Sequence, residues 1–318
     1  MVHYNKHRSG SLAFRPRKRS ESQMPNINAW PKISEKRVLG FAGFKAGMTH
    51  IIYVDDTESP SKGSEVATAC TIIEVPPMVV YGVRGYKSKM VAGDILAEDL
   101  KILNPLGILK RTEKNAELSS EKLDDVYLLV YTQPNKAKFG RKNPDCMELA
   151  LGGKDVSEKL TYAKSLLGKE LKMSEVFKAG EFVDTASITI GKGLQGAVKR
   201  FGVSKQRRKA TGKVRHVGTL GPWHPSYVMY TTPMAGQMGY HKRSELNKRI
   251  MRIGTGTSLN PKGGFTGYGL IQEGNEFVLL KGSVGGPSKR LIRFRKAIRI
   301  LTAPKEPAVS YVSTESNQ

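Results

Sequence analysis

Short apolar runs, separated by turn residues, occupy two parts of the chain. In residues 36–110 the runs are RVLGFAGF, THIIYV, VATACTIIEV and MVVYGVRGY, with Gly, Pro, Asp and Ser between them. The same texture returns in residues 254–305, where Gly-Asn and Gly-Gly-Pro mark hairpin turns. Runs rich in β-branched and aromatic residues between such turns predict strands. We therefore expect a mainly β protein in which these two halves close one antiparallel barrel.

The last apolar run, LIRFRKAIR, alternates apolar residues with arginines. Ile292 and Phe294 share one parity, and Arg293 and Arg295 share the other. Successive side chains of a strand point to opposite faces of the sheet. The pattern predicts one face in the core and one face that presents guanidinium groups.

The chain between the two halves has a different texture. Residues 111–190 are close to charge balance and contain strand-like VYLLVYTQ and MELALGG, and a helix-like VSEKLTYAKSLLG that ends at a glycine. We expect an inserted α/β lobe with a structural role.

Cationic residues gather in residues 191–253. A stretch with so little opposing charge is a poor candidate for a neutral protein interface. Only Glu245 opposes the cations, which are Lys192, Lys199, Arg200, Lys205, Arg207, Arg208, Lys209, Lys213, Arg215, Lys242, Arg243, Lys248, Arg249 and Arg252.

A window inside this basic stretch, residues 217–240, has no Lys, Arg, Asp or Glu. If the flanking segments run as two arms, Pro222 and Pro225 stiffen a turn that places Trp223 and His224 at a tip. His241 and Lys242 directly follow the window. The alternative is an ordinary tryptophan packed in the core of a hairpin. Because the arms bring like charges together, we favour an extended finger between phosphates, whose rings stack on bases.

The charge balance of the whole chain points the same way. In 318 residues, 52 Lys and Arg oppose 28 Asp and Glu, giving a formal net charge of +24. Such self-repulsion favours a polyanionic partner, and nucleic acid is the first candidate.

The two ends of the chain are expected to form tails. Residues 1–35 form a basic tail that we expect to become ordered on this partner, and a free solubilising tail is the alternative. Residues 306–318 form a second tail. The candidate cations of the first tail are Arg8, Arg15, Arg17, Lys18 and Arg19.

Several classes of protein are disfavoured. No signal-peptide core and no apolar span of membrane length occur. Two distant cysteines indicate a reducing compartment and two buried thiols. The histidines lack HExxH spacing and accompanying cysteine pairs, and no GxSxG nucleophile context occurs. We expect a cytoplasmic protein that is not an enzyme and carries no metal or cofactor.

One motif offers an alternative function. GKGLQG, with Gly191, Gly193 and Gly196, fits the GxGxxG pattern of dinucleotide-binding proteins and stands between a predicted strand and a helix-like segment. The acidic residue that should follow about 20 positions later is missing. A nucleotide-dependent enzyme therefore remains only the second hypothesis. We expect the glycines instead to let backbone amides approach an RNA phosphate.

Six ordered blocks of the sequence resemble the universal ribosomal protein L-three family of the large subunit, in its archaeal type. The similarity runs from about residue 2 to residue 299. The blocks are GFAGFKAGMTHI, TIIEVPPMVVYGVRGY, GKGLQGAVKRFGV, GPWHPSYV, GQMGYHKRSELNKRI and LLKGSVGGPSKRLIRFRKA.

The resemblance implies a split β-barrel of the translation-protein type with an inserted lobe and a long central extension. It implies binding to large-subunit ribosomal RNA early in assembly, beside other large-subunit proteins. By resemblance, Trp223 stands at the tip of the extension, near the peptidyl transferase centre and the aminoacyl-tRNA entry region, where the contact with tRNA and elongation factors is indirect. Arg293 and Arg295 then join the other cations as RNA-binding candidates. Eukaryotic members carry a methylated histidine where this chain has Thr211, so that modification is not carried over.

Overall fold

The computed structural model describes residues 17–108, 118, 123–300 and 305–316. Two of the candidate cations, Arg8 and Arg15, therefore lie outside the described residues. The chain divides into two compact units. Unit 1 contains residues 1–22 and 188–242, and unit 2 contains residues 23–187 and 243–318.

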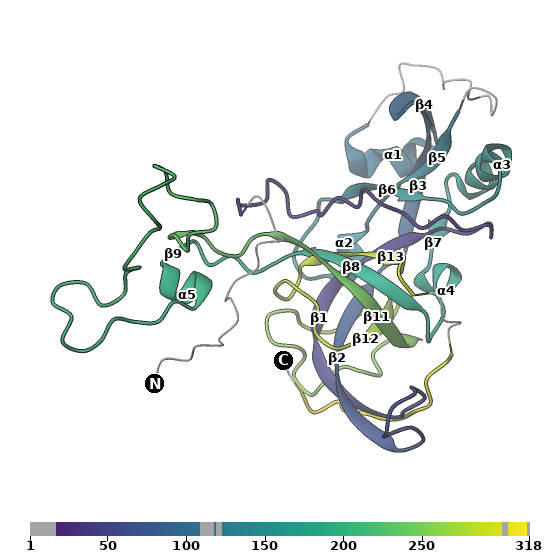
Figure 1. Ribbon diagram of the computed structural model, residues 1–318. Helices are drawn as coiled ribbons and strands as arrows, with labels where there is room; N and C mark the ends of the chain where they lie inside the picture. The colour runs from purple at the N-terminus through teal and green to yellow at the C-terminus, as the bar shows by residue number, and fades with distance from the viewer. Residues whose placement is uncertain (1–16, 109–117, 119–122, 301–304, 317–318) are drawn as a thin grey trace. The chain divides into compact units, whose positions relative to one another are not determined.

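The larger sheet of unit 2 joins early and late strands of the chain. Its order is β13-β8-β11-β12-β2-β1-β14, and β13 also pairs with β1, so the ladder closes on itself (Figure 1). The prediction of a mainly β fold is confirmed. The strands are β1 (Gly40–Val54), β2 (Glu65–Val75), β8 (Phe182–Ile188), β11 (Lys242–Thr255), β12 (Glu276–Lys281), β13 (Leu291–Lys296) and β14 (Val309–Val312).

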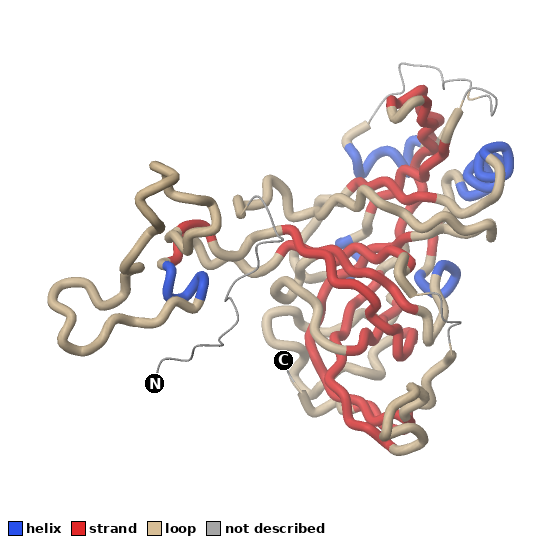
Figure 2. The backbone as a smooth tube through the Cα atoms, in the orientation of Figure 1, coloured by secondary structure: helices blue, strands red, loops and turns tan. Residues whose placement is uncertain are grey.

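A second sheet, of order β4-β3-β5-β6 with β7 beside β3, forms the rest of the strand structure of unit 2 (Figure 2). β3 and β4 of this sheet lie in residues 36–110, which we expected to form part of the barrel. Residues 36–110 therefore contribute strands to both sheets. An apolar pattern predicts strands, but it does not reveal which strands pair. The strands are β3 (Met78–Lys87), β4 (Met90–Leu96), β5 (Asp125–Tyr131), β6 (Cys146–Ala150) and β7 (Glu170–Leu171).

Helices are short in unit 2. The helix expected after residue 155 is present as α3 and contacts β5. None of the described helices has the length and apolarity needed to cross a membrane. Of the two cysteines, Cys70 is buried as expected, whereas Cys146 is exposed, and both are free. The helices are α1 (Leu100–Leu103), η1 (Asn104–Leu106), α2 (Pro134–Ala137), α3 (Val156–Leu166) and α4 (Met173–Val176).

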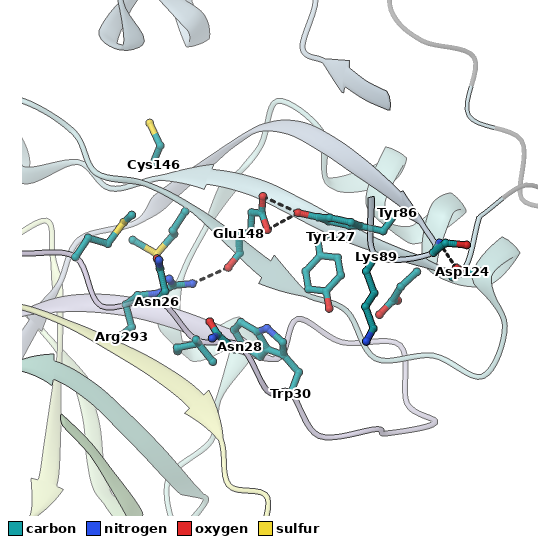
Figure 3. Close-up of a pocket in the computed structure, with 15 residues that line it drawn as sticks. Asn26, Asn28, Trp30, Tyr86, Lys89, Asp124, Tyr127, Cys146, Glu148 and Arg293 are labelled. Carbon is teal, nitrogen blue, oxygen red and sulfur yellow. Dashed lines mark hydrogen bonds between the residues drawn. The ribbon is translucent and has the colours of Figure 1, made fainter. Parts of the chain in front are cut away.

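The alternating arginines of β13 do not form an outer cationic face. Arg293 is only 3% exposed, and its guanidinium donates to the carbonyl oxygens of Pro25 (3.0 Å) and Glu148 (2.7 Å) (Figure 3). Arg295 donates to another carbonyl of residues 24–30, which we call the strap. The prediction of an exposed guanidinium face is therefore wrong at Arg293, because the strap lies over it. Burial lowers the pKa of Arg293 to about 10.

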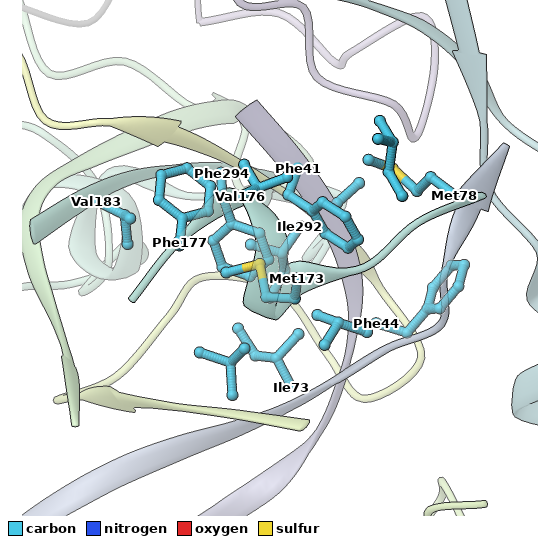
Figure 4. Close-up of a cluster of buried hydrophobic side chains, with 14 of the residues drawn as sticks. Phe41, Phe44, Ile73, Met78, Met173, Val176, Phe177, Val183, Ile292 and Phe294 are labelled. Carbon is cyan, nitrogen blue, oxygen red and sulfur yellow. The ribbon is translucent and has the colours of Figure 1, made fainter. Parts of the chain in front are cut away.

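Buried aliphatic and aromatic side chains pack together in the core of unit 2 (Figure 4). Phe41 pairs with Phe294 across β1 and β13, and both are fully buried, as is Phe44. Burying a side chain of this size contributes about 1.5–3 kcal/mol. Strand packing is so close at Gly43 that a Cβ there would lie 2.8 Å from the carbonyl oxygen of Glu74. The glycines of GFAGF thus permit a β1 buried on both faces.

A buried carboxylate fastens a long loop, residues 256–275, to the ring. Glu74 on β2 is 0% exposed and accepts hydrogen bonds from the Tyr268 hydroxyl, the Gln272 amide (3.1 Å) and the Asn275 side chain (2.6 Å). Burial raises the pKa of Glu74, and the three donors act against that rise. A buried carboxylate is tolerated only with such partners.

Removing one of these donors should destabilise unit 2. We predict that Tyr268→Phe lowers the free energy of unfolding by about 1–3 kcal/mol, because it leaves Glu74 short of a partner in a buried site. Urea denaturation followed by circular dichroism measures the change. Tyr311→Phe is the matched control, because Tyr311 is 46% exposed and its variant should match the parent protein. Equal stability of both variants would contradict the role of Glu74 as an anchor.

Candidate nucleic-acid interface

Unit 1 is built on a two-stranded stem. β9 (Leu194–Gln195) pairs antiparallel with β10 (Gly236–Gln237). The pairing continues below these strands, because the Lys192 amide donates to Met238 (2.9 Å) and the Met238 amide donates to Gly193 (2.9 Å). Residues 192–195, which precede the charge-free window, therefore run beside residues 236–238, near the end of that window. Most of the chain between them is loop (Figure 2).

Two glycines of the stem have a positive φ, and at one of them a side chain would also collide with the backbone. Gly239 has φ +71°, and a Cβ there would collide with the carbonyl oxygen of Ile190. Gly193 of the GKGLQG motif also has a positive φ, +63°, but nothing lies within 4 Å of its Cβ position. Left-handed backbone favours glycine at both positions, whereas close approach requires it only at Gly239.

A short helix, α5 (Ala197–Phe201), ends at Gly202 in the left-handed conformation and buries Phe201. Arg200 donates to the carbonyl oxygens of Gln237 (3.2 Å) and Met234 (2.9 Å). The guanidiniums of Arg200 and Arg17 lie 5.1 Å and 4.7 Å from the centre of the Phe201 ring. These two candidate cations therefore hold unit 1 together, a role that sequence spacing did not reveal.

The tip of the loop exposes its aromatic side chains. Trp223 is 88% exposed, and its ring meets that of His224 edge-on at 6.5 Å. The hydroxyl of Thr232 donates to the carbonyl of Leu220 (3.0 Å) and narrows the base of the tip. The alternative of a tryptophan packed in a hairpin core is therefore wrong.

Two further aromatic residues of the tip were not among the candidates. Tyr227 is 72% exposed and Tyr230 is 68% exposed. Both tyrosines lie in the charge-free window, 217–240, and this position could have identified them as residues of the tip. A window folded into a core would have buried them. The tip thus offers several rings to a partner instead of one.

Cations surround this tip without opposing charge. Residues 188–242 contain ten Lys and Arg and no Asp or Glu. Lys18 pairs with Glu21 at 3.2 Å. Like charges at this density repel one another, and phosphates placed between them remove that cost. The exposed candidates are Lys18, Arg19, Lys192, Lys199, Lys205, Arg207, Arg208, Lys209, Lys213, Arg215 and Lys242.

His241 has a backbone partner in unit 1. Its Nδ1 lies 2.9 Å from the carbonyl oxygen of Lys18, and the amide of Ser20 donates to Tyr240 (2.8 Å). The described end of the basic tail therefore follows the second arm, and His241 contributes to that attachment.

Four candidate cations of unit 2 serve its own fold. Arg249 is buried and pairs with both carboxylate oxygens of Asp56 (2.5 and 2.6 Å), which lowers the pKa of Asp56. Lys248 donates to Ser283 (2.7 Å), and Arg295 pairs with Asp184 (2.5 Å). Arg293 is held by the strap as described. Arg243 is half-buried, and burial lowers its pKa.

The dinucleotide-binding alternative finds no supporting geometry. GKGLQG lies in the stem, and the helix after it has five residues. The strand before it, β8, pairs antiparallel with β13, whereas a dinucleotide fold needs parallel strands. In the described part of the chain, no group of three His, Cys, Asp or Glu could hold a metal ion.

Close packing of the stem at Gly239 can be tested by substitution. We predict that Gly239→Ala accelerates amide hydrogen exchange at Lys192 and Met238 by roughly tenfold or more, because it adds a backbone collision to the cost of left-handed backbone. Exchange measured by NMR or mass spectrometry tests this. Gly193→Ala is the control, since it carries the left-handed cost alone and should have the smaller effect. Equal exchange in the two variants would contradict close packing of the arms.

Known proteins identify the family. The family described as Ribosomal protein L3 matches residues 1–96 and 109–318. The chain is 44% identical over 337 residues to the large ribosomal subunit protein uL3 of Methanothermobacter thermautotrophicus, covering 100% of this chain and 99% of the relative. It is 45% identical over 339 residues to uL3 of Methanocaldococcus jannaschii, with the same coverage. The family is one of ribosomal proteins and not of enzymes, as predicted, and the chain belongs to the ribosomal protein L3 family.

Proposed function

We propose that this chain is a structural constituent of the large ribosomal subunit and that unit 1 binds large-subunit ribosomal RNA. The relatives are named as large-subunit proteins. The observation that carries the RNA-binding proposal is the set of exposed cations in residues 188–242, a segment that has no Asp or Glu and contains a charge-free aromatic tip. Cations in this arrangement bind phosphates whatever the sequence, and they set the position of the chain on the RNA.

The tip supplies contacts that the cations cannot. Trp223 and His224 lie at a turn without charged neighbours in the sequence, so they can enter a narrow space between nucleotides without carrying hydrated ammonium groups into it. Aromatic rings stack on unpaired bases. The tip therefore fits a cleft in folded RNA, and the arms neutralise the phosphates along the cleft walls.

The family resemblance supports a more specific proposal. In this proposal the protein joins the RNA early in assembly and supports the peptidyl transferase centre and the aminoacyl-tRNA entry region. Its other partners are neighbouring large-subunit proteins, and its effect on tRNA and elongation factors is indirect. RNA carries out the chemistry, so the protein needs no cofactor. The test is sedimentation: presence of the protein in the mature large subunit would support this role, and its absence from mature particles would point to an assembly factor instead.

Salt dependence of RNA binding tests the arms. We predict that combined Arg207→Ala, Arg208→Ala and Lys209→Ala reduces the slope of log K against log salt by about 2–3, because each phosphate contact contributes about 0.7–0.9. A filter-binding titration of the full chain with a large-subunit RNA fragment measures the slope.

A matched triple variant of unit 2 is the control. Lys101→Ala, Lys154→Ala and Lys164→Ala remove the same number of exposed charges and should leave the slope nearly unchanged. If both triple variants reduced the slope equally, net charge alone would explain binding and the proposed interface would be wrong.

Trp223→Ala tests the tip separately. We predict a loss of about 1–3 kcal/mol in binding to the RNA fragment, as for other base-stacking aromatics, with an unchanged salt slope. The thermal unfolding midpoint should not change, because the ring is 88% exposed. In particles, tRNA or factor passage should suffer more than folding. A markedly lower unfolding temperature would show that Trp223 supports the fold after all.

A further inference from the structure

Unit 2 contains a cavity that the RNA-binding proposal does not use. Its volume is about 980 Å³, which is within the range of sites that hold a ligand. The strap forms one wall, and the β3–β4 turn, β5 and β6 form the others. Figure 3 shows Trp30 and Tyr127 beside the same space, with Lys89 and Asp124 toward one end.

The aromatic walls are fixed in place by packing and by hydrogen bonds. Trp30 lies so close to β1 that a Cβ at Gly40 would be 2.8 Å from its ring. Tyr86 donates to both oxygens of Glu148 (3.0 and 3.1 Å), and its ring meets that of Tyr127 edge-on at 5.2 Å. These rings are therefore arranged before any ligand arrives, which lowers the entropic cost of binding.

The charge of the cavity is the reverse of that of the chain. Asp124, Asp125 and Glu148 line it, against Lys89 and Arg293, in a protein of net charge +24. The guanidinium of Arg293 is occupied by carbonyl oxygens, as described above. Carboxylates therefore outnumber cations in the cavity, unlike in the chain as a whole.

One carboxylate of the cavity has no cation of its own. Arg84 pairs with Glu148 (2.7 Å), and Lys159 pairs with Asp125 (2.8 Å). Asp124 is exposed, accepts the Ser88 amide (2.5 Å), and has no ion pair within the described residues. Burial, followed by the negative charge of Asp125, raises the pKa of Tyr127 to about 12. The electrostatic field beside this ring thus favours a cation.

We propose that this cavity binds an arginine-bearing extended segment of a basic partner protein. The guanidinium lies between the aromatic walls and pairs with Asp124, since planar cations stack on aromatic faces and pair with carboxylates. The side chains of Asn26, Asn28 and Lys89 supply donors for the carbonyls of the peptide backbone. A nucleotide is less suited, because its phosphate would approach three carboxylates with a single lysine to offset them.

Fluorescence of Trp30 provides the test. The chain has two tryptophans, so the full-length Trp223→Phe protein reports from Trp30 alone. We predict a saturable change with the peptide acetyl-Gly-Gly-Arg-Gly-Gly-amide. The same peptide with neutral citrulline for arginine should bind roughly threefold to tenfold more weakly, because it lacks the cation. This readout does not depend on RNA binding by unit 1.

Asp124→Asn should weaken binding of the arginine peptide by the same factor and leave binding of the citrulline peptide unchanged. The asparagine retains an oxygen for the Ser88 amide, so folding is preserved. Asp99→Asn is the matched control, since Asp99 is exposed and outside the cavity. Equal binding of the two peptides, or no saturable response to either, overturns the proposal. A response to a single-stranded RNA oligonucleotide that Lys89→Ala abolishes would make the cavity a nucleotide site instead.

Discussion

Ten lysines and arginines without a single carboxylate, in residues 188–242, cannot build a core of their own, so unit 1 depends on main-chain hydrogen bonds between its arms. Peptide groups pair whatever side chains they carry. The stem pairs residues 192–195 with residues 236–238, and Gly239 allows the approach because a Cβ there would collide with the carbonyl oxygen of Ile190. Repulsion among the cations of residues 188–242 remains in the free protein, and a polyanion relieves it.

Arginine has two distinct uses in this chain, and the local supply of acceptors decides between them. In unit 2, Arg249 pairs with Asp56 and Arg295 pairs with Asp184, so each guanidinium forms an ion pair within the same fold. Arg200 in unit 1 has no carboxylate nearby in sequence and instead donates to carbonyls that close the loop. The neighbouring exposed cations, such as Arg207 and Arg208, are left for a partner. The same residue type thus serves either stability or recognition.

The acidic cavity fits this division. If unit 1 binds RNA as proposed, the carboxylates of the cavity belong to a different unit from the cations that would contact phosphate. Asp124 is such a carboxylate, and it lines the same cavity as the rings of Trp30 and Tyr127. One chain can then address two chemically opposite partners, with RNA at unit 1 and a basic polypeptide at unit 2.

The sequence by itself determined the mainly β fold, the helix after residue 155 and the basic stretch with its charge-free window, because periodicity and charge are local properties of the chain. It also identified the family through its ordered blocks. Tertiary structure alone decided that β3 and β4 leave the ring for a second sheet and that the strap lies over Arg293. It likewise decided that Arg17 and Arg200 meet at Phe201 and that Trp30 and Tyr127 line one cavity. Each of these depends on pairing between distant segments, and the alternation of apolar and polar residues records which face of a strand is buried but not what buries it.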